Sequence, residues 1–146
     1  MAENQIVGLW KLVSCEAIRS NGTRIPIYGK HPVGLLYYDE AGNMSVHIMK
    51  SGRRHCDSET KFGASADEMK AAYEGYEAYF SHYTVDTEKR TINHKVVGSL
   101  FPNWTGSVQR RHYAFDGGDR LVLSTHPIGS EPRTGPIVEL VWERLR

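Results

Sequence analysis

His94 is the residue in this sequence whose type and surroundings most readily suggest chemistry. It stands between Ile92 and Val96 in an alternating stretch, and residues two apart in a strand share a face. A histidine on an apolar, inward face is held as neutral imidazole, which can act as a general base or hydrogen-bond a carbonyl group. The same pattern equally fits a core histidine satisfied by its neighbours, and both interpretations stay open.

Arg111 and Tyr113 form a second candidate pair, two residues apart in a later alternating stretch. The same alternation turns Gln109 inward and Arg110 outward, and a register slip of one residue would exchange the two arginines. Together Arg111 and Tyr113 could clamp a carboxylate or an enolate.

A cation inside a barrel must be paired with a fixed carboxylate or with an anionic group of a ligand. Glu16 and Glu139 are the carboxylates we consider for Arg111. In the first alternating run, Ser14 and Glu16 share a face with Trp10, so we expect both at the mouth, with Glu16 as a base or as the partner of Arg111. Further expected ligand contacts are Tyr38, Asn103 and Trp104.

These side chains must be positioned by strands, because most of the sequence alternates with a period of two between Gly-, Asn- and Asp-containing turns. Eight strands are predicted, at residues 6–18, 33–38, 43–49, 82–85, 90–97, 107–115, 120–125 and 136–145.

One segment follows a helical period instead, since Met69, Tyr73, Tyr76, Phe80 and Tyr83 recur every three or four residues. The run 65–68, Ser-Ala-Asp-Glu, fits a capping box at its start. We expect an amphipathic helix between the third and fourth strands, packed on the barrel or plugging its end, preceded by a loop at 50–64 over one end of the sheet.

Eight antiparallel strands and one helix predict an all-β, single-domain chain over residues 1–146, either a closed up-and-down barrel or a sandwich. Closure would remove exposed sheet edges, and an eight-stranded barrel has room for one small ligand.

Composition excludes several classes of protein. The 146 residues are 40% hydrophobic and carry a formal charge of +1, which implies neither nucleic acid nor an anionic membrane as partner. Cys15 and Cys56 lack the spacing of a disulfide framework, and we find no signal peptide and no membrane span, so we expect a cytoplasmic protein.

Seven histidines invite a metal hypothesis, but their spacing gives no ligand set, and no phosphate or dinucleotide motif is found. We therefore expect no metal and no cofactor. Heme held by His94 is conceivable, although nothing in the sequence requires it.

Several short motifs together resemble the lipocalin-like domain family of bacterial and fungal intracellular proteins. They are Gly-Leu-Trp at 8–10, Trp-Glu-Arg at 142–144, and the runs at 32–38, 42–46, 83–86, 91–94 and 99–104. The resemblance implies a calycin-type barrel in which Arg144 stacks on Trp10 and seals the base. Many members accompany enzymes of secondary metabolism, and some are regarded as cyclases or isomerases.

These observations predict a barrel that binds a small hydrophobic metabolite. We expect a cofactor-free isomerase, cyclase or lyase acting on a carbonyl compound, with His94 as base and Arg111 or a tyrosine as electrophilic donor. The alternatives are a non-catalytic carrier or sensor and an accessory protein without a ligand. The ligand's identity and a homodimeric state are left open.

Overall fold

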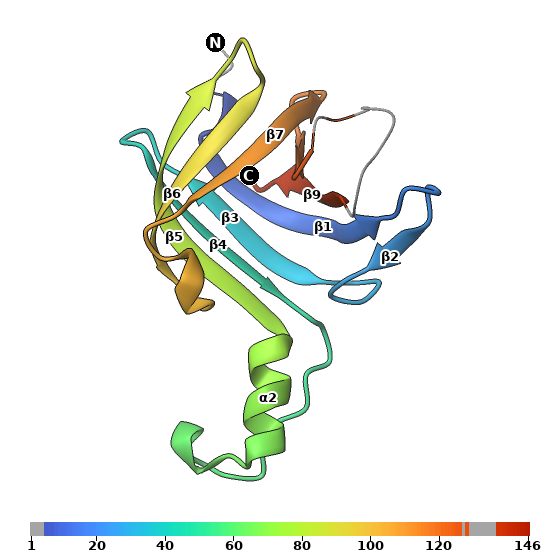
Figure 1. Cartoon of the computed structure of the whole chain (residues 1–146), viewed down its shortest axis with the longest axis vertical. Helices are drawn as coiled ribbons and strands as arrows, with labels where there is room; N and C mark the ends of the chain where they lie inside the picture. The colour runs from blue at the N-terminus through green and yellow to red at the C-terminus, as the bar shows by residue number, and fades with distance from the viewer. Residues whose placement is uncertain (1–4, 127, 129–136) are drawn as a thin grey trace.

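A computed structural model describes residues 5–126, 128 and 137–146, and in this part of the chain nine strands form one antiparallel sheet (Figure 1). The strands are β1 (Gly8–Ile18), β2 (Arg24–Pro26), β3 (Val33–Tyr38), β4 (Asn43–Met49), β5 (Tyr76–Asp86), β6 (Thr91–Ser99), β7 (Val108–Asp116), β8 (Arg120–Ser124) and β9 (Ile137–Arg144). Residue 136, the predicted start of the last strand, lies outside the described residues.

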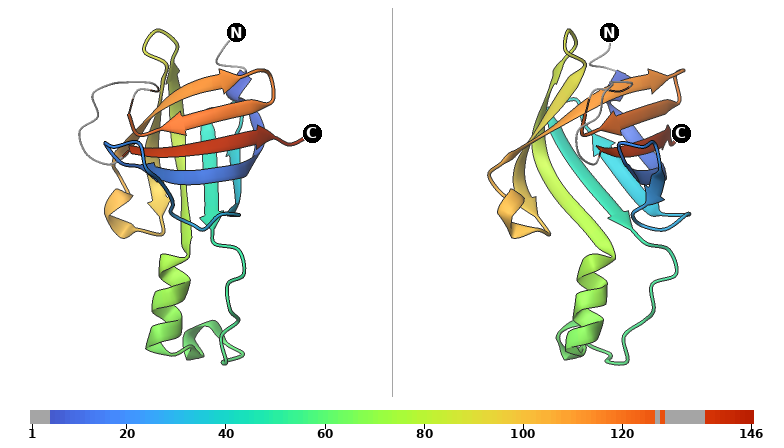
Figure 2. Two further views of the ribbon diagram at one scale, coloured as in Figure 1. Left: turned by 90° about the vertical axis from the view of Figure 1, so that its right-hand side faces the viewer. Right: turned by 45° about the vertical axis from the view of Figure 1, so that its right-hand side comes forward.

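The sheet closes because β1 pairs with both β3 and β9. Eight strands, β1 and β3 to β9, therefore form a closed antiparallel barrel in which neighbours in sequence are neighbours in space, as predicted. Figure 2 shows β1, β7, β8 and β9 crossing β3 to β6 at a large angle, so that the barrel has two faces joined at its corners.

The short strand β2 was not predicted, and it lies outside the barrel's cycle of strands. It pairs with the end of β1, from Glu16 opposite Pro26 to Ile18 opposite Arg24. With three residues it carries too little alternation to be recognised in the sequence. Because of it, the helix follows the fourth strand of the sheet and not the third.

The helix α2 (Ala66–Glu74) begins as predicted, with the hydroxyl of Ser65 accepting from the Glu68 backbone N–H and the Glu68 carboxylate accepting from that of Ser65. It ends at Gly75, earlier than predicted. The aromatic residues from Tyr76 onward belong to β5, which pairs with β4 and β6 along most of its length. In this segment the pairing with neighbouring strands determines the structure, although the spacing of the aromatic residues also fits a helical period.

The helix neither plugs the barrel nor packs on its wall, so this part of the prediction is wrong. No residue of α2 is buried, and the side chains of Met69 and Tyr73 are 43% and 49% exposed. Residues 50–75, called the arm below, extend away from the barrel, and residues 50–60 run beside α2 rather than over the sheet (Figure 1). The 3₁₀ turn η1 (Lys61–Gly63) lies in the arm.

Large apolar side chains fill part of the barrel interior. Trp10, Leu36, Ile92, Leu121 and Trp142 are at most 1% exposed. They come from five different strands, so this cluster joins both faces of the barrel. Among the described residues, no helix has the length and apolar character that crossing a membrane requires.

Candidate functional site

Beside this cluster, and bordered by Leu36 and Trp142 from it, the interior holds a cavity of about 330 Å³, called the barrel cavity below. Most of its wall is apolar and includes Leu36, Val46, Ile48, Leu123 and Leu140. Ligand pockets in proteins typically occupy about 300–1,000 Å³ and combine such walls with a few polar groups. The volume and lining therefore suit one small, largely apolar molecule.

The polar groups of the cavity come mainly from the adjacent strands β5, β6 and β7. These strands contribute Glu77 and Tyr79, His94, and Gln109 and Arg111, respectively. Because inward residues of neighbouring strands lie side by side, their polar groups gather on one wall of an otherwise apolar cavity.

Tyr38, His94 and Tyr79 form a hydrogen-bonded triad at this wall. The Tyr38 hydroxyl lies 2.7 Å from His94 Nε2, and the Tyr79 hydroxyl lies 2.8 Å from His94 Nδ1. A rotation of the imidazole by 180° would put carbon atoms in place of both nitrogens, so these two bonds fix the ring's orientation. His94 and Tyr79 line the cavity, whereas Tyr38 lies behind them.

Burial keeps all three members of the triad uncharged at neutral pH. It lowers the pKa of His94 to about 3, and the charge of Arg111 contributes in the same direction. Burial raises the pKa of Tyr79 to about 12 and the pKa of Tyr38 well above its usual value, although Arg111 acts against both shifts. The triad is thus a neutral network of donors and acceptors next to a positive charge.

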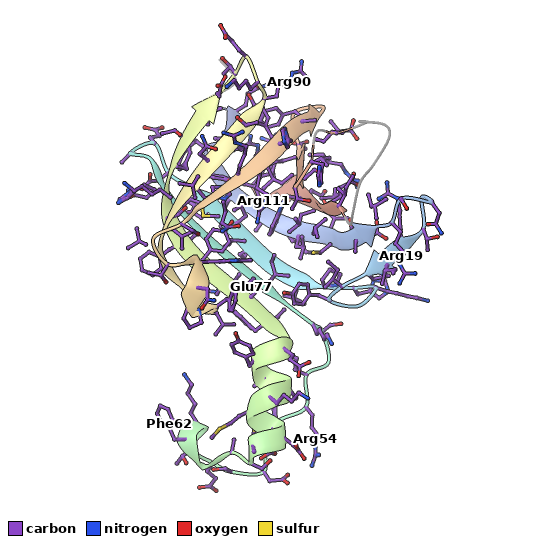
Figure 3. The ribbon with its side chains drawn as sticks, viewed as in Figure 1. Arg19, Arg54, Phe62, Glu77, Arg90 and Arg111 are labelled. Carbon is purple, nitrogen blue, oxygen red and sulfur yellow. The ribbon has the colours of Figure 1, made fainter. Side chains whose placement is uncertain are left out.

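Arg111 lines the cavity, whereas Arg110 faces outward, where its Nε lies 3.4 Å from Asn93 Oδ1. The prediction from strand alternation that Arg111 faces inward is therefore confirmed. Its Nη1 donates to the carbonyl oxygen of Arg110 at 2.9 Å. Glu77 is the carboxylate in the same cavity; burial raises its pKa, and the charge of Arg111 opposes that rise. Figure 3 shows both side chains at the barrel.

The carboxylates considered as partners of Arg111 bind another arginine instead. Nη1 of Arg24 lies 3.3 Å from Glu16 and 3.0 Å from Glu139 on the outer surface. The prediction that Glu16 or Glu139 pairs with Arg111 is wrong.

A β-bulge explains why Ser14 and Glu16 do not face the mouth as predicted. The register between β1 and β9 shifts between Leu12 and Ser14, so the residues after the bulge reverse their faces. Cys15 lines the cavity in their place, and burial raises the pKa of its thiol to about 12.

The remaining predicted contacts divide between the cavity and other places. Trp104, in the 3₁₀ turn η2 (Pro102–Trp104), lines the cavity and meets the ring of Tyr79 edge to face, with centroids 5.9 Å apart. Gln109 also lines it and donates to the Ser107 hydroxyl at 3.0 Å. Asn103 is exposed and is not part of the lining.

Tyr113 is not part of the cavity lining either. It is 6% exposed and packs against Phe115, with ring centroids 5.7 Å apart. The geometry therefore does not bring Tyr113 to the cavity beside Arg111, and Tyr79 is the tyrosine that lies there.

Sequence reasoning missed Glu77 and considered Tyr79 only as a helix residue whose hydroxyl could reach a pocket, because it placed this segment in the helix. The signal that could have found them is the alternation of Glu77, Tyr79 and Ser81 with exposed Phe80 and His82. This period of two is visible only if the helix is ended at Gly75.

The predicted stacking of Arg144 on Trp10 is confirmed, with the guanidinium carbon 4.2 Å from the ring centroid. Nη1 of Arg144 also donates to the carbonyl oxygen of Val7 at 2.9 Å, and Nη2 donates to that of Gln5. The Trp10 indole N–H donates to the Ile6 carbonyl at 2.9 Å. Neither Trp10 nor Arg144 lines the cavity, so both have a structural role.

A larger hollow of about 1,100 Å³ lies between α2 and residues 49–56. Most residues around it are exposed, so it resembles an open gap more than a binding site. Within the described residues, no group of three or more His, Cys, Asp or Glu side chains is arranged to hold a metal ion.

Known proteins similar to this chain include a carrier protein. The chain is 31% identical over 112 residues to the 4'-hydroxy-3'-methoxypropiophenone carrier protein ppsC of Aspergillus oryzae, a match covering 70% of this chain and 96% of the relative. It is also similar to the solved structure of a redesigned β-barrel, with 10% identity, a TM-score of 0.46, and coverage of 99% of this chain and 96% of that one. The model of the lipocalin-like domain family matches residues 7–145, and the chain therefore belongs to that family.

Proposed function

We propose that the barrel binds and carries one small, mainly apolar molecule that bears an acceptor oxygen. The observation that supports this most directly is the cavity of about 330 Å³, with apolar walls and one polar wall containing His94, Tyr79 and Arg111. Apolar walls favour binding by removing ligand surface from water, and the few polar groups fix its orientation.

The named relative favours an aryl ketone as the class of ligand. That protein's name describes it as the carrier of a propiophenone with a hydroxyl and a methoxy substituent. Such a compound combines an apolar ring with a carbonyl oxygen, which matches the division of the cavity into apolar and polar walls. We therefore propose this compound class for the present chain.

The test is a titration with 4'-hydroxy-3'-methoxypropiophenone, combined with native mass spectrometry of the protein purified from its own cells. Two variants make a matched pair: Val46→Phe adds volume inside the cavity, and Val97→Phe makes the same change on the outer surface, where Val97 is 46% exposed. We expect Val46→Phe to weaken binding at least about tenfold and Val97→Phe to leave it unchanged. Equal affinities in both variants would contradict the proposal.

Catalysis as a cofactor-free isomerase, cyclase or lyase is the second candidate. Tyr79 and Arg111 favour it, because a hydrogen-bond donor and a positive charge at one wall would stabilise an enolate. The low pKa of His94 argues against the predicted role of His94 as general base, because a general base works best with a pKa near the working pH. Conversion of the bound ketone, followed by NMR, separates the two functions: a carrier returns the ketone unchanged.

We propose a cytoplasmic location because Cys15 and Cys56 are both free thiols. The sequence leaves a homodimer open, and sedimentation velocity at two protein concentrations tests it.

A further inference from the structure

The triad contains one hydrogen more than its own hydrogen bonds can use. A neutral imidazole has one N–H donor and one bare nitrogen acceptor, while each tyrosine contributes one O–H. His94 therefore accepts a hydrogen from only one tyrosine and donates its own to the other. The second tyrosine's hydrogen must be directed elsewhere, and the two tautomers of His94 differ in which tyrosine that is.

Burial distinguishes the two tautomers. Tyr38 is 0% exposed and does not line the cavity, and within the described part of the chain His94 Nε2 is the one hydrogen-bond partner of its hydroxyl. If Nε2 carried the proton, the Tyr38 hydrogen would be buried without an acceptor, which is costly. Tyr79 lines the cavity, so its hydrogen can reach a ligand or water there.

The geometry therefore assigns a direction to the whole triad: Tyr38 donates to Nε2, and the Nδ1–H of His94 donates to the oxygen of Tyr79. We propose that the Tyr79 hydroxyl, with its hydrogen directed into the cavity, is the group that binds the ligand's acceptor oxygen. This deepens the proposed function and rests on it. Tyr38 and His94 are positioning residues, since they act through Tyr79.

Two neighbours suit Tyr79 to this role. The ring of Trp104 meets the ring of Tyr79 at an interplanar angle of 89°, which limits how far Tyr79 can tilt. Arg111 lines the same cavity and adds a positive charge that favours an electron-rich oxygen. A ligand that lacks an acceptor oxygen would displace water from the Tyr79 hydroxyl without replacing its hydrogen bond, so the site selects for compounds with an acceptor oxygen.

The first experiment needs no ligand. The ¹⁵N chemical shifts of the His94 ring, assigned by their loss in His94→Gln, report which nitrogen carries the proton. We expect a protonated Nδ1 and a bare Nε2 at neutral pH. A proton on Nε2 would overturn the assigned direction.

The second experiment measures the ligand itself. The propiophenone is labelled with ¹³C at its carbonyl group, and the infrared stretch of that group is recorded in the bound state. In the wild type we expect a lower frequency than in an apolar solvent, because the carbonyl accepts a hydrogen bond. Tyr79→Phe should abolish that shift and weaken binding about fivefold.

Tyr38→Phe provides the decisive variant, because Tyr38 does not line the cavity. Without the Tyr38 donor, Nε2 of His94 loses the hydrogen bond that it accepts, but a proton on Nε2 would be a buried donor without an acceptor, so the proton should stay on Nδ1. We expect Tyr38→Phe to move the ¹⁵N shift of Nε2 toward that of a nitrogen without a hydrogen bond and to reduce the carbonyl shift in part, because hydrogen bonds in a chain strengthen one another. Tyr37→Phe, at an outward residue that is 48% exposed, is the control and should match the wild type.

The outcomes separate this inference from the proposed function. If the wild type binds the ketone but Tyr79→Phe gives the same carbonyl frequency as the wild type, the inference is overturned and the carrier function still stands. Failure of the wild type to bind any aryl ketone overturns the proposed ligand and this inference with it.

Discussion

His94 links the stability of the barrel to pH through its burial. Its pKa is about 3 in the folded protein and near 6.5 in the unfolded chain, so the unfolded chain binds the extra proton between these values. Unfolding therefore becomes easier as pH falls below about 6.5. We expect the free energy of unfolding to decrease by about 1 kcal/mol between pH 6 and pH 5 from this residue alone.

Urea denaturation of the wild type and His94→Gln at both pH values measures this contribution. The variant should lose about 1 kcal/mol less than the wild type over that interval, whatever its absolute stability. His112, whose pKa is also lowered, contributes equally to both proteins and cancels. If the free energies of unfolding of the two proteins depend on pH in the same way, His94 takes up its proton as readily in the folded protein as in the unfolded chain.

Arg144 is the residue for which we predict the largest stability effect outside the cavity. It stacks on Trp10 and donates to the backbone carbonyls of Gln5 and Val7. Arg144→Leu should cost about 2–3 kcal/mol, since it removes a cation–π contact and charged hydrogen bonds. Arg144→Lys should recover only part of this loss, because an ammonium lacks the planar fork. Ligand affinity, measured in parallel, should not change.

At the scale of elements, alternation in the sequence was enough to predict eight strands in a barrel or a sandwich, with the observed bounds for β3 and β4, and the family resemblance implied the barrel. Alternation also correctly predicted that His94 and Arg111 face inward. It failed at Ser14 and Glu16, because a single bulged position after Leu12 reverses every face that follows. Sequence alone gives no sign of that bulge, since the residues on both sides of it alternate acceptably.

The end of the helix was the second point at which the sequence was ambiguous. Aromatic residues at 73, 76, 80 and 83 satisfy a helical period, yet the last three belong to β5. Pairing of β5 with β4 and β6 depends on residues far away in sequence, which a local pattern does not contain. This error placed Tyr79 on the helix, whereas Tyr113 entered the predicted site for another reason, its alternation with Arg111.

The arm is predicted to be dispensable for the barrel. The last pair between β4 and β5 joins Met49 to Tyr76, and the Lys50 N–H donates to the Gly75 carbonyl at 3.0 Å. Replacing residues 51–74 by Asn-Gly should therefore join the two strands by a two-residue hairpin turn. We expect the shortened barrel to change in stability by less than about 1 kcal/mol, because no residue of α2 is buried.

Thermal denaturation and ligand titration of the shortened protein check this prediction. Residues 51–74 do not line the barrel cavity, so affinity should match that of the full chain. Ser65→Ala in the full chain is the milder control: it breaks the capping box and should reduce helix content while the barrel's unfolding stays unchanged. An unfolded or non-binding shortened protein would show that the arm supports the barrel.

For the whole molecule, the cavity makes stability depend on ligand concentration. The apolar cluster fills only part of the barrel interior, and a cavity of about 330 Å³ lies beside it. A ligand that binds only the folded state adds about 2.7 kcal/mol to the free energy of unfolding at a concentration 100 times its Kd. For a domain of 146 residues this corresponds to a rise of about 8 °C in Tm.

Two variants show whether that rise comes from the cavity. Val46→Phe occupies part of the space itself, so its Tm should respond much less to the propiophenone than the wild type's, even if the ligand-free Tm differs. Val97→Phe should keep the full response, because its new ring lies outside the barrel. Equal rises in all three proteins would mean that the ligand binds elsewhere, since only a molecule seated between the apolar walls competes with the added ring for the same volume.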